Sequence, residues 1–85
     1  MSMVLDLIAA VVNAVRQIDD QMMKLRSFSN EIDKITQRVE SAFSGSERQY
    51  GQQMLQQLAL TKSQVSDSLA RLQMAKEKLL QVRMK

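Results

Sequence analysis

The sequence predicts an all-α fold, an antiparallel hairpin of two long helices. Proline is absent from the 85 residues, and glycine occurs only twice. Apolar residues recur at alternating steps of four and three on both sides of one short break near residue 45. Good helix formers dominate the composition, and this spacing is typical of a heptad seam, so we expect two helices that each pack along one face.

The first predicted helix covers residues about 3–42, roughly 60 Å at 1.5 Å per residue. Its apolar stripe is regular as far as Leu25 and then slips by one residue to Phe28. Ser29 and Thr36 occupy positions where an unbroken heptad would place apolar groups. We therefore expect the stripe to rotate around the helix beyond Leu25, accommodated by gentle bending or by a change of partner. The predicted stripe contains Val4, Ile8, Val11, Val15, Ile18, Met22, Leu25, Phe28, Ile32, Ile35, Val39 and Ala42.

The turn is predicted over residues 43–46. Gly45 follows Phe43 by two residues and suits the left-handed conformation that ends many helices. Ser46 and Gln49 have the spacing of a capping box, which satisfies free amide groups at the start of a helix. A helix stop and a helix start this close together predict two helices that fold back on each other. A single continuous rod is the weaker alternative.

The second predicted helix covers residues about 47–84. Lys62 falls near a seam position, so its amine must reach outward past the apolar groups. Gly51, one turn into the helix, costs about 1 kcal/mol relative to alanine. Either a bulky group from the other helix needs the space, or the first turn is frayed. The apolar stripe of this helix contains Leu55, Leu58, Val65, Leu69, Leu72, Ala75, Leu79 and Val82.

The N-terminal part of the first helix is more apolar than a hairpin requires. In the hairpin, residues 4–18 run beside residues 71–85, and one neighbouring helix covers only one stripe. A helix that is apolar almost all round is normally buried on every side. We therefore expect a four-helix bundle, completed by dimerisation or by docking of a partner. The candidate partner-binding residues are Val4, Leu7, Ile8, Val11, Val12, Val15 and Ile18.

The composition argues against catalysis. Cysteine and histidine are both absent, which excludes disulfides, thiolate nucleophiles and ordinary zinc sites. The acidic residues are scattered, and the adjacent Asp19 and Asp20 project in different directions, so they do not form a working pair of carboxylates. No glycine-rich phosphate loop is present. We expect a protein that is not an enzyme, with no catalytic residue, cofactor or metal.

The net charge of +3 is concentrated at the C-terminus, where residues 71–85 carry +4. The three aromatic residues lie elsewhere, which favours a solvated helix end at the negative dipole pole over a nucleic-acid site. The apolar start is shorter than the roughly 20 residues that span a bilayer, and it lacks the basic region of a signal peptide. We expect a soluble chain without stable membrane insertion, and contact with an anionic membrane surface is a weaker alternative.

Two helices of about forty residues, joined at Phe43-Ser44-Gly45, resemble the WxG family of small helical hairpins. This family serves bacterial type VII (Esx) secretion and includes relatives encoded beside LXG toxins. Its turn carries an aromatic-x-Gly motif, with tryptophan more usual than the phenylalanine found here. The resemblance implies four-helix bundles formed as homodimers or heterodimers. It also implies one of two roles, an exported substrate or a partner that assists a toxin's helical N-terminal domain.

Exported members often end in a Tyr-x-x-x-Asp/Glu signal, and this chain has nothing similar, its only tyrosine being Tyr50. We therefore predict a non-enzymatic adaptor that binds the helical N-terminal domain of a type VII secretion effector of the LXG type. We expect it in the bacterial cytoplasm, or exported together with its partner. The alternative is a self-assembling structural hairpin like the needle subunits of type III secretion, which usually carry a proline in the turn.

Overall fold

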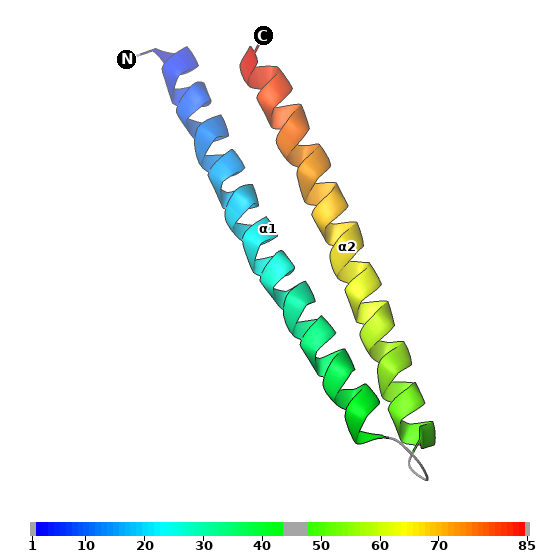
Figure 1. The fold of residues 1–85 in the computed structure, drawn as a ribbon. Helices are drawn as coiled ribbons and strands as arrows, with labels where there is room; N and C mark the ends of the chain where they lie inside the picture. The colour runs from blue at the N-terminus through cyan, green and yellow to red at the C-terminus, as the bar shows by residue number, and fades with distance from the viewer. Residues whose placement is uncertain (1, 44–47, 85) are drawn as a thin grey trace.

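The computed structural model describes residues 2–43 and 48–84, which form two long helices packed side by side (Figure 1). Helix α1 spans Met3–Ala42 and helix α2 spans Arg48–Met84. The two run antiparallel, so that the start of α1 and the end of α2 lie at the same end of the rod (Figure 1). The predicted all-α hairpin is confirmed. Its completion into a four-helix bundle involves a further molecule and stays a prediction.

Nearby residues explain where α1 begins and where it ends. The Ser2 hydroxyl accepts a hydrogen bond from the Val4 amide at 3.2 Å, and Asp6 lies in the first turn near the positive helix pole. At the other end, the Phe43 amide donates to the Val39 carbonyl at 3.0 Å and closes the last turn. The predicted turn residues Gly45 and Ser46 lie outside the described residues, and Gln49 is an exposed residue of the first turn of α2.

The side of α1 that faces α2 keeps one unbroken heptad seam. Its buried and half-buried residues alternate by steps of four and three without a slip. Ser29 and Thr36 both lie half-buried in this seam. The Thr36 hydroxyl donates to the Ile32 carbonyl at 2.8 Å, so it enters the seam with its donor satisfied. The α1 seam consists of Val11, Val15, Ile18, Met22, Leu25, Ser29, Ile32, Thr36, Val39 and Phe43.

The predicted rotation of the stripe beyond Leu25 is therefore wrong. Phe28, Ile35 and Ala42 are all exposed. Ile35 keeps 40% of its surface in solvent, whereas Ile32, one turn away, keeps only 2%. Small side chains such as serine and threonine fit between two helices, and a strict seven-residue repeat lets the helices stay in contact along their length. The three exposed residues form a second stripe beside the seam.

The seam of α2 also differs in part from its predicted stripe. Ala75 and Val82 are exposed, and Lys76 lies half-buried where Ala75 was expected. The Lys76 ammonium pairs with Asp19 of α1 at 2.7 Å, so the aliphatic stem covers the seam while the charge reaches its edge. Between Leu58 and Val65, the half-buried Thr61 and the exposed Lys62 lie at the edge of the seam. The other described residues of the α2 seam are Gly51, Leu55, Leu58, Val65, Leu69, Leu72, Lys76 and Leu79.

Gly51 lies at the turn end of the hairpin, next to Phe43. The residue is buried, and a Cβ added to it would lie 2.5 Å from the Phe43 Cβ and 3.1 Å from the Phe43 Cγ. The sequence left two explanations for this glycine, a bulky group from the other helix or a frayed first turn, and the structure favours the bulky group. Phe43, the residue that ends α1, occupies the space that a side chain at position 51 would need.

The hairpin has little core. The buried apolar residues of the described chain are Val11, Met22, Ile32, Val39 and Val65. The molecule measures 69 × 15 × 13 Å and exposes 6899 Å² of surface. A compact protein of its mass, 9.7 kDa, would expose only about 5,100 Å². The excess of about 1,800 Å² is apolar and polar surface that a two-helix rod cannot bury by itself.

Two ion pairs connect the helices at equivalent positions. Asp33 pairs with Lys62, and Asp19 pairs with Lys76. The two acidic residues are fourteen positions apart, as are the two lysines, which is two heptads on each helix. Because both helices advance by the same repeat between the pairs, the register of the seam is kept over this length.

Reversing one charge of the Asp19–Lys76 pair is expected to have a small effect on the free energy of unfolding, and this effect should depend on salt. Asp19→Lys places two cations together and should lower the free energy of unfolding by about 0.5–1 kcal/mol, since both side chains are partly exposed. The exchange Asp19→Lys with Lys76→Asp should recover most of this loss, and high salt should shrink the difference. Urea denaturation followed by circular dichroism measures both effects. Equal losses in the single and double variants would show that the two charges do not interact.

Candidate interaction surfaces

The N-terminal end of α1 is an exposed apolar tip. The exposed fractions are 85% for Met3, 64% for Val4, 63% for Leu5 and 60% for Leu7. Residues this close together in sequence project from more than one side of a helix, so no single neighbouring helix can cover them all. We call these four residues the apolar tip.

The predicted partner-binding residues divide into three groups by burial. Val4 and Leu7 belong to the apolar tip, and Ile8 beside them is 37% exposed. Val12, Val15 and Ile18 are half-buried. Val11 is buried at 8% exposure in the seam with α2, so the hairpin already uses it. The structure thus brings Val4, Leu7 and Ile8 to the surface, whereas Val11, Val15 and Ile18 belong to the seam with α2.

A second surface runs along one side of the seam. Each heptad places two residues in the seam, three positions apart. In an antiparallel helix pair, the residues that directly precede the first of these two positions on each helix come together on the same side. None of these eleven residues carries a charge, and nine of them are exposed. We call this surface the neutral flank. It consists of Leu7, Ala14, Gln21, Phe28, Ile35 and Ala42 from α1, and Met54, Thr61, Ser68, Ala75 and Val82 from α2.

The large side chains of the neutral flank are well exposed. Phe28 is 49% exposed, Met54 44% and Val82 58%. The sequence carries a signal for this surface that the expected slip concealed: Phe28, Ile35 and Ala42 are spaced by sevens. Three apolar residues at that spacing form a row of their own beside the seam, rather than a continuation of it.

The opposite side of the seam is charged. Asp33 and Glu40 from α1 line a hollow there with Ala59 and Lys62 from α2. Both interhelical ion pairs lie on this side. We call it the charged flank. The two flanks of the hairpin therefore differ in chemistry, and only the neutral one presents a long surface without charge.

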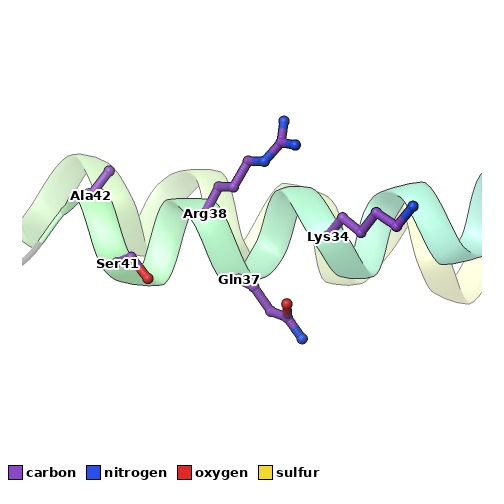
Figure 2. Close-up of a pocket in the computed structure, with 5 residues that line it drawn as sticks. All are labelled: Lys34, Gln37, Arg38, Ser41 and Ala42. Carbon is purple, nitrogen blue, oxygen red and sulfur yellow. The ribbon is translucent and has the colours of Figure 1, made fainter.

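A shallow hollow on the outer surface of α1 has no arrangement suited to catalysis. Its lining is Lys34, Gln37, Arg38, Ser41 and Ala42, whose longer side chains diverge from the helix (Figure 2). Lys34 makes an ion pair with Glu31 of the same helix at 3.3 Å, and both groups are well exposed. This hollow is solvated helix surface.

Neither flank nor the apolar tip carries a metal-binding cluster. Over residues 2–43 and 48–84, no group of three or more His, Cys, Asp or Glu side chains could hold an ion. Across the same two ranges, no helix combines the length and the apolar character needed to cross a membrane.

No protein-family model matches the chain, and neither the curated proteins nor the solved structures include a match.

Proposed function

We propose that this protein is a non-enzymatic helical adaptor that binds a helical partner protein through the apolar tip and the neighbouring Ile8 and Val12. The observation that carries the proposal is the exposure of Met3, Val4, Leu5 and Leu7, which project from more than one side of α1. Fully burying one such side chain contributes about 1.5–3 kcal/mol. A partner that encloses the tip therefore gains enough to bind the rod without any polar site.

The resemblance of length, layout and turn to the WxG family supports a specific partner. In this proposal the partner is the helical N-terminal domain of a type VII secretion effector of the LXG type, and the adaptor assists its export. Docking adds helices around the tip and completes a four-helix bundle. The adaptor acts in the bacterial cytoplasm or is exported together with its partner.

The docking surface is tested by placing charge on it. The double variant Ile8→Asp/Val12→Asp should bind a coexpressed effector domain at least about tenfold more weakly, because two buried carboxylates would face an apolar partner. Ile8 is 37% exposed and Val12 half-buried, so the helices should persist. Pull-down together with circular dichroism measures both properties. The matched control is Met23→Asp, a 63% exposed site elsewhere on α1. Unchanged binding by the double variant with intact helicity would exclude this surface.

A self-assembling structural hairpin is the second candidate, favoured by the presence on one rod of both the apolar tip and the neutral flank, which share only Leu7. Contacts between unlike surfaces do not close and can continue into long assemblies. This candidate predicts large oligomers of the purified chain whose size grows with concentration in light scattering. A monodisperse small species would contradict it.

A further inference from the structure

We propose that the side of the hairpin that carries the neutral flank lies flat against an anionic lipid membrane. The apolar side chains of the flank then lie at the headgroup boundary, and the lysines and arginines beside them pair with lipid phosphates. This inference goes beyond the adaptor function, because the apolar tip receives the protein partner and this side of the rod receives the lipid. Three observations support it: the cations beside the flank, the net charge of the two sides and the exposed apolar residues between the cations.

Lysines and arginines lie directly beside the neutral flank on both helices. They directly precede the second seam residue of a heptad, which places them three or four residues from a flank residue and on the same side of the helix. On α1, Lys24 lies one turn from Phe28, and Arg38 lies one turn from Ile35. All four of these cations are exposed. We call them the basic rim, which consists of Lys24 and Arg38 from α1 and Arg71 and Lys78 from α2.

The basic rim gives this side of the hairpin a positive net charge. Among the ten described residues of the two rim rows, the acidic one is Glu31, and its carboxylate pairs with Lys34 at 3.3 Å. Four cations against one acid leave a net charge of +3. On the opposite side, acids and cations are equal in number: Asp19, Asp33, Glu40 and Glu77 against Arg16, Arg26, Lys62 and Lys76. Charge therefore attracts an anionic surface to the side of the neutral flank.

The residues between the rim cations suit the boundary between lipid headgroups and acyl chains. Phe28, Ile35 and Met54 are exposed there, and Tyr50, one turn from Met54 in the rim row of α2, is 66% exposed. Exposed apolar patches bordered by polar residues mark interaction sites. A helical surface with apolar residues bordered by lysine and arginine lies in the plane of the membrane interface, where tyrosine is also enriched. Such contact needs no helix that crosses the bilayer.

The extent of the surface favours a lipid bilayer over a second copy of the chain. From Leu7 to Ala42 the flank is about 53 Å long at 1.5 Å per residue. The rim cations are spread along it, from Arg38 near the turn to Lys78 near the end of α2. An anionic bilayer offers negative charge over this whole length. A second copy packed on this side would place the same cations on both sides of the contact, where they repel each other.

The test is cosedimentation of the purified full-length chain with lipid vesicles. We expect binding to vesicles of equal parts phosphatidylglycerol and phosphatidylcholine, little binding to phosphatidylcholine alone, and weaker binding at high salt. Lys24→Gln/Arg71→Gln should weaken binding by about 30-fold, since each cation near an anionic surface contributes about fivefold. The matched control is Arg16→Gln/Arg26→Gln, two exposed cations on the opposite side, which should weaken binding less than about threefold. Circular dichroism verifies that each variant remains helical.

A second pair of variants tests the apolar contact. Met54→Gln should weaken vesicle binding by about tenfold, because an uncharged polar side chain of similar size replaces an apolar one. Met74→Gln, at a 56% exposed site outside the flank and the rim rows, should leave binding unchanged. Tyr50 is the only tyrosine of the chain, so its fluorescence reports which side meets the lipid. Its quenching by acrylamide should fall when anionic vesicles are added.

Failure to bind the phosphatidylglycerol vesicles would overturn the proposal, and so would equal binding to both kinds of vesicle or equal losses in the rim variant and its control. An acidic protein that shields Tyr50 while vesicles do not bind would also overturn it, since this side would then belong to that protein. The adaptor proposal is tested separately, because Ile8→Asp/Val12→Asp changes neither the flank nor the rim. A chain that captures the effector domain without binding vesicles would refute the membrane contact alone, and one that binds vesicles without capturing the domain would refute the adaptor alone.

Discussion

Replacing Ile32 with alanine is expected to lower the free energy of unfolding by about 2–5 kcal/mol. With 2% exposure, Ile32 is the most buried side chain of the seam. Removing it leaves a cavity between α1 and α2 that a rod of two helices cannot fill from elsewhere. Since whole domains are stable by only about 5–15 kcal/mol, the hairpin should be largely unfolded in mild urea. Urea denaturation followed by circular dichroism at 222 nm, the usual helix signal, gives the loss directly.

Ile35→Ala is the matched control, because it removes the same atoms one turn away. Ile35 is 40% exposed on the neutral flank, so its truncation should cost less than about 1 kcal/mol in the separated hairpin. The measurement is made at protein concentrations low enough to suppress any association through that flank. Equal losses for Ile32 and Ile35 would mean that the seam rotates after Leu25 and that the unbroken heptad is wrong.

Gly51→Ala is expected to destabilise the hairpin by about 1–3 kcal/mol, even though alanine is the better helix former. The new methyl group would lie 2.5 Å from the Phe43 Cβ. That atom is attached to the backbone at the end of α1, so no rotation of the phenyl ring relieves the contact. One of the two helices must shift instead. Thermal denaturation followed by circular dichroism measures the loss.

A change at position 43 separates this contact from a general intolerance of alanine at position 51. Phe43→Ala is a poor control, because it keeps the Cβ that makes the contact. Phe43→Gly removes it, and in that background Gly51→Ala should become neutral or stabilising by up to about 1 kcal/mol. The double-mutant cycle then shows a coupling between positions 43 and 51. Additive effects of the two changes would contradict the close approach.

Much of the fold is contained in the local sequence. The lack of proline and the abundance of helix formers predict two long helices, and they span Met3–Ala42 and Arg48–Met84 against the expected ranges of about 3–42 and 47–84. The predicted outward reach of Lys62 is seen in its pairing with Asp33. These features depend on a residue and its near neighbours along the helix, which the sequence displays directly.

The local sequence does not decide which of two apolar stripes of α1 is buried. Around residues 25–42 the sequence offers two overlapping rows: one through Ile32 that includes Ser29 and Thr36, the other through Phe28 and Ile35. The second row is the more apolar, so sequence reasoning placed it in the seam. Either row is compatible with the same helix, because both lie within one broad apolar face.

The sequence by itself determined two helices, a stop between them and an apolar tip that a hairpin cannot cover. Only the tertiary structure decided that α2 lies over Ser29, Ile32 and Thr36, because burial depends on where the second helix sits and that position is a property of both helices together. The tertiary structure also explains the glycine at position 51, because Phe43, eight positions earlier in the chain, occupies the space that a side chain there would need. With α2 in this position, Phe28 and Ile35 lie outside the seam and belong to the exposed neutral flank, which is available for binding.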